Sequence, residues 1–174
     1  MIPKKEELKL AQDYSDGQKQ AAYFILGEIV NLLFPFSDDM RIVGGWVPSL
    51  LYPDQQHIGS IDVDILLDQT KIKKAESYAT IKELLKKNGY SQHPKKYFTF
   101  TKPVVDVDFL SGMYGGVSGS VSKHVDGIKT LPATGGNFAF EFPPEDVKIE
   151  YQRPDGALDF GHVNVIAVIP YIVM

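Results

Sequence analysis

The spacing of apolar residues predicts two long helices. Apolar positions recur at helical spacing from about residue 16, where Ser15 or Asp16 can cap the helix, to about Leu33. A second stretch with this spacing runs from about Lys71 to Lys87 and ends before Gly89, a residue that commonly terminates helices. Each helix has one apolar side, so both are expected to pack on another layer of structure.

The other apolar runs are short and are bounded by Gly, Pro, Asp or Lys, which is typical of strands. They are Met40–Val43, Ser60–Leu67, Tyr97–Thr101, Val104–Leu110, Phe138–Phe142, Val147–Tyr151 and His162–Ile169. Residues 111–136 are rich in Gly and Ser and are predicted to be irregular, with Lys123 and His124 near the middle. Because helices and strands alternate in the first half of the chain, we expect an α+β fold, a mixed β-sheet with flanking helices.

Two carboxylates lie inside the strand-like run Ser60–Leu67. Residues two apart in a strand project from the same face, so Asp62 and Asp64 are expected to point one way while their apolar neighbours point into a core. Two carboxylates so close repel each other and are costly to desolvate unless a cation lies between them. Oxygen ligands suit magnesium or manganese, so the pattern predicts a divalent metal site.

The run Val104–Leu110 carries a second alternating pair, Asp106 and Asp108. If this strand lies beside the strand of Asp62 and Asp64, one member of the second pair completes an oxygen cage. Such a cage can hold one or two magnesium ions about 3.5–4 Å apart, which suits nucleotidyl transfer. The pattern leaves open whether Asp106 or Asp108 is the third carboxylate.

Gly44 and Gly45 end the first strand-like run and precede a predicted short helix. Glycines at this place let the backbone approach a triphosphate, with amide groups at the start of the helix as donors. Taken alone, the pair is better explained as a tight turn.

Composition limits the classes of function without choosing one. The 174 residues, of which 44% are hydrophobic and 23% charged, are ordinary for a globular chain. The net charge of −4 gives no sign of a broad nucleic-acid-binding face. The chain has no cysteine, which excludes disulfides and thiolate metal sites. It also lacks an apolar signal core or a stretch of membrane-spanning length, so we expect a cytoplasmic protein with no membrane partner.

The order of these motifs resembles that of the nucleotidyltransferases of the DNA polymerase β superfamily. More narrowly, VGGWVPSLLY followed by SIDVDILLD is similar to the minimal nucleotidyltransferases and the AbiEii-type toxins of type IV toxin–antitoxin systems. In those proteins a GG turn leads into a short helix, and Ser or Thr precedes Asp-x-Asp, as Ser60 does here. The resemblance covers about Met40 to Ser111. The family often has an arginine shortly before this motif, where this chain has His57.

The resemblance implies a polymerase β-like fold, magnesium or manganese as cofactor and a nucleoside triphosphate as donor. The metal ligands that it implies are Asp62, Asp64 and Asp108, with Asp106 as the alternative third carboxylate and catalytic residue. Contacts to the nucleotide are implied for Gly44, Gly45 and Ser60. The acceptor stays open between tRNA, a protein and a small molecule, and an antitoxin protein is an implied partner.

We expect one nucleotidyltransferase domain over residues 1–174, with its core at about residues 15–115. The chain is apolar from Val163 to Met174 and has no polar tail, which favours a piece of a longer protein. AbiEii-like proteins have a helical C-terminal region that contributes a lysine and further acidic residues. The resemblance places such a region beyond Met174.

Plainer interpretations remain. An Asp-x-Asp pair can be the solvated face of an edge strand. An inactive nucleotide- or partner-binding module of the same fold is one alternative to an enzyme, and a structural domain whose acidic strands contact a basic partner is another. His57, Lys123 and His124 are expected to be ordinary loop residues, and Trp46 is expected to pack the short helix onto the core.

Overall fold

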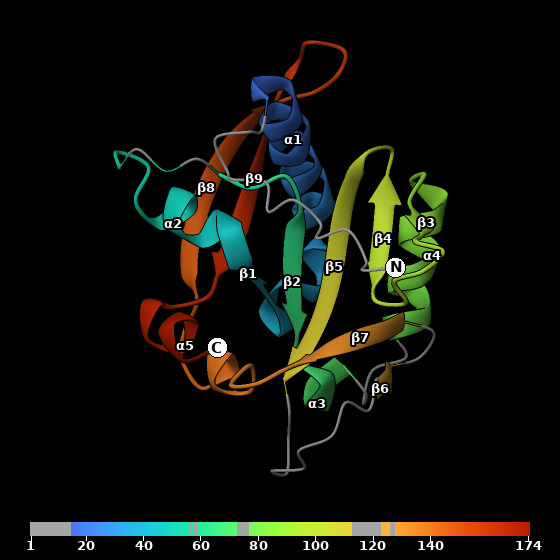
Figure 1. Ribbon diagram of the computed structural model, residues 1–174, viewed down its shortest axis with the longest axis vertical. Coiled ribbons are helices and arrows are strands. Elements are labelled where there is room, and N and C mark those ends of the chain that lie inside the picture. Colours follow the sequence, from blue (N-terminus) through green and yellow to red (C-terminus); the bar gives the residue numbers. More distant parts are fainter. Residues whose placement is uncertain (1–14, 56, 58, 73–76, 113–122, 126–127) are drawn as a thin grey trace, which may run out of the picture.

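The structure is a computed structural model that describes residues 15–55, 57, 59–72, 77–112, 123–125 and 128–174 (Figure 1). It has a mixed β-sheet with helices packed on it, so the α+β class predicted from the sequence is confirmed. The strands are β1 Met40–Val43, β2 Val63–Leu67, β3 Ser91–Gln92, β4 Thr99–Lys102, β5 Val105–Gly112, β6 Lys123–Val125, β7 Ile128–Ala133, β8 Glu145–Gln152 and β9 Leu158–Val165.

The helices are α1 Asp16–Leu32, α2 Val47–Leu51, α3 Gln69–Ile72, α4 Ser77–Lys87 and α5 Val168–Val173. Short 3₁₀ helices are η2 Phe34–Asp39, η3 Gly44–Trp46 and η4 Phe138–Phe140. The short helix expected after Gly45 is confirmed as η3 continuing into α2. No helix in the described part of the chain is both long and apolar enough to cross a membrane.

The sheet has the strand order β3-β4-β5-β2-β1-β9-β8. At its centre, β2 runs antiparallel to β1 and parallel to β5. β9 runs parallel to β1 and forms an antiparallel hairpin with β8. On the outer side of β5, β4 pairs with its first half and β7 with its last residues. This order puts β5, β2 and β1 in the middle of the sheet (Figure 1). The GG turn follows β1, and the carboxylate pairs lie on β5 and at the start of β2.

One face of the central strands is apolar and sealed from solvent. Val63 and Ile65 of β2, and Val107 and Phe109 of β5, are all 0% exposed. Phe109 packs edge-on against Phe100 of β4, with ring centroids 5.8 Å apart. Side chains alternate between the faces of a strand, so the carboxylates of β2 and β5 project from the opposite face.

Helix α1 covers the apolar face and lies behind the sheet in the view of Figure 1. It begins with a capping box, in which the Ser15 hydroxyl accepts a hydrogen bond from the Gln18 amide and the Gln18 side chain accepts one from the Ser15 amide. Gly27 lies where α1 crosses β8, since a Cβ there would be 2.2 Å from the ring of Tyr151. A glycine therefore sets how closely α1 approaches the sheet.

Several boundaries in the first two thirds of the chain differ from the prediction. The helix predicted over Lys71–Lys87 is replaced by α3 and α4, with residues 73–76 outside the described part. The strand predicted from Ser60 begins only at Val63, so Asp62 lies in a bend before it. The prediction of an irregular segment over residues 111–136 is wrong for 111–112, which end β5, and for 123–125 and 128–133, which form β6 and β7. β7 lies along β5, and β6 pairs with β7. The few apolar residues of β7 follow a Gly- and Ser-rich tract, so the sequence pattern did not indicate a strand there.

One predicted strand near the C-terminus is wrong, and another is right only in its first half. Phe138–Phe142 forms a 3₁₀ turn instead, and the two prolines that follow it have no amide to donate to a ladder. The run His162–Ile169 divides, because β9 ends at Val165 and α5 begins at Val168. Apolar runs of this length do not distinguish a buried strand from a short helix by periodicity.

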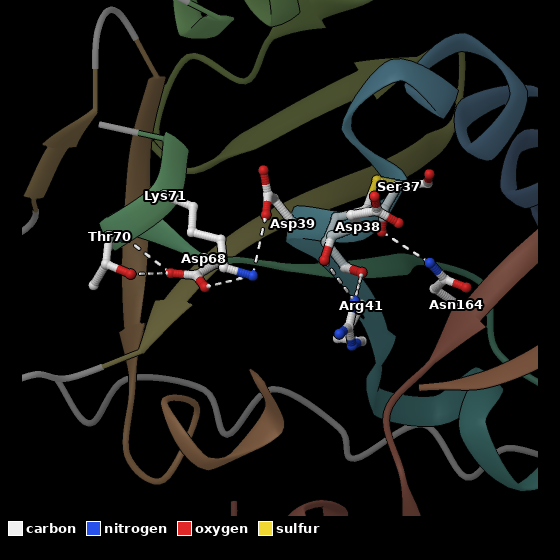
Figure 2. A network of polar contacts seen from close by, with 9 residues as sticks. Ser37, Asp38, Asp39, Arg41, Asp68, Thr70, Lys71 and Asn164 are labelled. Atoms are coloured by element: carbon white, nitrogen blue, oxygen red, sulfur yellow. Dashed lines mark hydrogen bonds and ion pairs between the residues drawn. The ribbon is translucent and has the colours of Figure 1, made fainter. Parts of the chain in front are cut away.

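Polar contacts hold the end of β1 and β2 that is distant from the GG turn (Figure 2). The Arg41 side chain is buried, donates from Nη1 to the Asp38 carbonyl oxygen at 3.0 Å, and lies 4.9 Å from the centroid of the Phe140 ring. Lys71 Nζ lies 3.6 Å from Asp39 Oδ1 and so links α3 to the start of β1. These contacts anchor one end of the central strands, while the other end carries the carboxylates.

Replacement of Gly27 by Ala is expected to lower the free energy of unfolding by about 1–3 kcal/mol, because the added methyl group overlaps the Tyr151 ring. Urea unfolding followed by circular dichroism measures this change. Gly17→Ala in the same helix is the matched control, since a Cβ at Gly17 meets nothing within 4 Å. The control should be neutral or stabilising. Equal effects of the two substitutions would contradict the proposed packing.

Candidate functional site

The pairing of β2 and β5 brings one carboxylate of each predicted pair together. The two strands are parallel, with Val63 opposite Val107 and Asp64 opposite Asp108. Paired positions on neighbouring strands lie about 4.8 Å apart and share a face of the sheet. Asp64 and Asp108 are thus adjacent on the face opposite the α1 layer.

Asp62 approaches the same place from the bend before β2. Its carboxylate accepts a short hydrogen bond from the Ser60 hydroxyl. Its backbone oxygen accepts a hydrogen bond of 2.8 Å from Nε1 of Trp46, whose ring is buried as expected from the sequence. The indole therefore has a second role that the sequence did not indicate: it fixes the bend that carries Asp62.

The three carboxylates influence one another electrostatically. Burial raises the pKa of Asp64 to about 7, and the negative charges of Asp62 and Asp108 contribute to that rise. Burial also raises the pKa of Asp108, although the hydrogen bond from Thr99 and the charge of Lys96 act against it. A buried carboxyl group with such neighbours is typical of a site that binds a cation or handles protons.

Asp106 has a different environment from Asp108. Its Oδ1 accepts a hydrogen bond of 2.9 Å from the Thr101 hydroxyl, and its Oδ2 lies 3.1 Å from Lys96 Nζ. Asp108 Oδ1 accepts a hydrogen bond of 2.6 Å from the Thr99 hydroxyl. Of the two candidates for a third carboxylate, Asp108 lies beside Asp64, whereas Asp106 is paired with Thr101 and Lys96.

Both glycines of the GG turn lie so close to neighbouring side chains that a Cβ atom would collide with them. Gly44 has φ +70°, and a Cβ there would lie 2.1 Å from Oδ2 of Asp64. A Cβ at Gly45 would lie 2.9 Å from the Ser60 hydroxyl oxygen. The turn thus packs directly on the carboxylate site and is more than a reversal of the chain. Helix α2 has only five residues, so donors to an anion here would be individual amides.

A cavity of about 350 Å³ opens beside Asp64, between the sheet and the C-terminal helix α5. Its lining residues are Val43, Gly44, Asp64, Leu110, Tyr171 and Met174. The Tyr171 hydroxyl donates to the Gly44 carbonyl oxygen at 3.3 Å. Sequence reasoning missed Tyr171, because the apolar C-terminal run gave no sign that it folds back onto the GG turn. A larger cavity of about 430 Å³ lies away from the carboxylates, by α1 and the β8–β9 hairpin.

Other residues considered in the sequence lie elsewhere. His57 is exposed in the loop before Ser60, and its Nδ1 lies 3.0 Å from the Ser49 hydroxyl oxygen. Lys123 and His124 belong to β6, which pairs with β7 through its backbone and not with the carboxylate strands. Thr99 and Lys96 were missed, because the pairing of β4 with β5 and the loop before β4 bring them to Asp108 and Asp106.

The donor set has the chemistry that magnesium or manganese prefers, namely carboxylate oxygens at a place where negative charges accumulate. The side chains are not gathered around a common point, however. Among the described residues, no group of three or more His, Cys, Asp or Glu side chains is arranged to hold a metal ion. Hydrogen bonds direct Asp62 to Ser60 and Asp108 to Thr99. Each of these hydrogen bonds occupies one carboxylate oxygen and leaves the other as a possible ligand.

Comparison of the chain with protein-family models, curated proteins and solved structures gave no match.

Replacement of Asp64 by Asn is expected to stabilise the protein above neutral pH but not near pH 4. The folded state keeps a proton on Asp64 up to about pH 7, whereas the unfolded chain releases it near pH 3.8. The free energy of unfolding of the unsubstituted protein therefore falls as the pH rises between these values. A neutral amide avoids this loss, which amounts to about 4 kcal/mol at most.

Urea unfolding at pH 4, 6 and 8 tests this expectation, with the exposed loop residue Asp54 changed to Asn as the control. Asp54→Asn should leave the pH dependence unchanged. A stability difference for Asp64→Asn that is the same at pH 4 and pH 8 would show that Asp64 ionises normally in the folded protein.

Proposed function

We propose that this chain is a metal-dependent nucleotidyltransferase with a polymerase β-like fold. The observation that carries the proposal is the placement of Asp64 opposite Asp108 in paired parallel strands, with the Gly44 turn packed on Asp64. Asp62 adds its charge to the pair. The resemblance noted in the sequence links the same residues to nucleotidyl transfer.

Asp62, Asp64 and Asp108 would hold magnesium or manganese. Burial raises the pKa of Asp64, and the charges of Asp62 and Asp108 add to that rise. This supports the assignment, because a divalent cation would offset the repulsion and favour the ionised carboxyl group. The bound metal supplies positive charge that neutralises the phosphates of the nucleotide.

The reaction transfers a nucleotide from a nucleoside triphosphate to an acceptor hydroxyl or phosphate. The acceptor oxygen forms a bond to the α-phosphorus, and the bond from that phosphorus to the leaving pyrophosphate breaks. Where the acceptor is a hydroxyl, Asp108 receives its proton. Thr99, through its hydrogen bond to Oδ1, orients the Asp108 side chain.

The GG turn and Ser60 bind the triphosphate in this proposal. Gly44 and Gly45 have no side chain, so a phosphate group can approach their backbone amides. The Ser60 hydroxyl now donates to Asp62 and can turn to a phosphate oxygen when Asp62 binds metal. The cavity beside Asp64 leaves space next to these groups.

The acceptor can be tRNA, a protein or a small molecule such as an antibiotic, and an antitoxin protein is a proposed partner. The net charge of −4 favours an acceptor that needs no long nucleic-acid contact. The second candidate function is an inactive nucleotide-binding module of the same fold. The absence of an assembled ligand group among the described residues favours that candidate.

Replacing both Asp62 and Asp64 by Ala is expected to abolish nucleotide transfer without unfolding the domain. The substitutions remove two metal ligands and also two mutually repelling charges, so stability should be kept or increased. Each labelled nucleoside triphosphate is incubated with magnesium or manganese and with tRNA, cell lysate protein or small-molecule acceptors. Label that passes to an acceptor only when both aspartates are present supports the enzyme. Equal transfer by the double variant would refute it.

Asp108→Asn and Asp106→Asn should differ strongly in the same assay. We expect loss of at least a hundredfold in rate for Asp108→Asn, which removes a ligand and base. Asp106→Asn should keep most of the activity, because Asp106 lies outside the proposed ligand set. Binding of labelled nucleotide without transfer, in every variant and in the unsubstituted chain, would favour the inactive module.

A further inference from the structure

We propose that Lys96 is a phosphate-binding residue of the carboxylate site. Its ammonium group pairs with Asp106 in the structure and exchanges that partner for an oxygen of the polyphosphate chain when substrate binds. The inference rests on the proposed nucleotidyl transfer and extends it, because it adds a cation to a site otherwise made of carboxylates and glycines.

The first observation is the position of Lys96 at the rim of the site. Its Nζ lies 3.1 Å from Asp106 Oδ2, and the Lys96 side chain is 48% exposed. Asp106 and Asp108 are two residues apart on one face of β5, which places them roughly 7 Å from each other. The flexible four-carbon stem of a lysine covers such a distance by rotation about its bonds.

The backbone that carries Lys96 is held in place. Nδ1 of His93 accepts hydrogen bonds from the amides of Lys95, at 3.1 Å, and Lys96, at 3.0 Å. The carbonyl oxygen of Lys96 accepts a hydrogen bond of 3.2 Å from the Thr99 amide. Thr99 is also the residue that orients Asp108. The loop therefore fixes the backbone of Lys96 relative to the carboxylates and leaves its side chain able to move.

The charges around Lys96 keep it positive. The hydrogen bond to Asp106 raises the pKa of Lys96, and the charges of Asp108 and Asp62 add to that effect. The ammonium group thus interacts electrostatically with Asp62 and Asp108, although its hydrogen bond is to Asp106. Once a metal neutralised those ligands, Lys96 would be attracted instead to the phosphates of the nucleotide.

The exchange of partners is energetically easy. An ion pair between partly exposed side chains contributes little to stability, because both groups are well solvated when apart. A phosphate oxygen offers a charge-assisted hydrogen bond at least as strong as that of the carboxylate. Asp106 would keep its hydrogen bond from Thr101 when Lys96 leaves, so it is not left unpaired.

Lys102 provides an informative contrast in the same part of the sheet. Its Nζ lies 2.7 Å from Oε1 of Glu28, a residue of α1. Since α1 covers the opposite face of the sheet, Lys102 is directed away from the carboxylates. It serves the packing of α1, whereas Lys96 faces the site.

The test is calorimetric titration of the protein with magnesium tripolyphosphate, which presents the phosphate chain without a base or sugar. Lys96→Gln should weaken binding about tenfold or more, the effect of losing one charge-assisted hydrogen bond. Lys96→Arg should restore most of the affinity. Lys95→Gln removes the same charge from an exposed neighbour and should change the affinity less than twofold. Asp106→Asn should bind as tightly as the unsubstituted protein or more tightly.

Urea midpoints equal to that of the unsubstituted protein establish that the variants are folded. If Lys96→Gln binds like the unsubstituted protein, if Lys95→Gln loses as much as Lys96→Gln, or if the unsubstituted protein does not bind tripolyphosphate, the role of Lys96 is refuted. Nucleotide transfer that persists in any of these cases leaves the proposed function intact. Binding that depends on Lys96 in a protein that transfers no nucleotide supports the phosphate site and refutes the transfer reaction.

Discussion

The contact between the Gly44 backbone and the Asp64 carboxylate is the constraint on which the site depends. A side chain at position 44 would overlap Asp64, so the end of β1 and the start of β2 can pair at this register only with glycine there. On the other side of β2, the parallel pairing with β5 sets the same Asp64 opposite Asp108. One close approach thus links the GG turn, the antiparallel pair and the parallel pair.

This arrangement carries an electrostatic cost that the protein limits without removing it. Hydrogen bonds from Ser60 and Thr99 compensate Asp62 and Asp108, while Asp64 is partly buried and has a raised pKa. A fold selected for stability alone would replace Asp64 with an apolar residue, since the opposite face of β2 is entirely apolar. That the protein keeps a carboxylate here in spite of its electrostatic cost is the physical reason for assigning a function to the carboxylate site.

The pattern of the chain determined the fold class, the first long helix and the central strands. Period-two alternation in β2 and β5 placed apolar residues on one face and carboxylates on the other, because side-chain direction in a strand depends only on position. Gly and Asp at fixed spacing also pointed to the site itself. The pattern was inadequate for short apolar runs such as Phe138–Phe142, where periodicity does not separate a strand from a 3₁₀ turn.

The tertiary structure alone decided which residues share the site. Asp106 and Asp108 are equivalent in the sequence, and only the strand register sets one beside Asp64 and the other beside Lys96. Tyr171 reaches the GG turn from the far end of the chain. The contact of Tyr171 with Gly44 joins residues more than a hundred positions apart, so it depends on the packing of whole elements. Local spacing carries no information about that packing, whereas it does determine which face of a strand each side chain occupies.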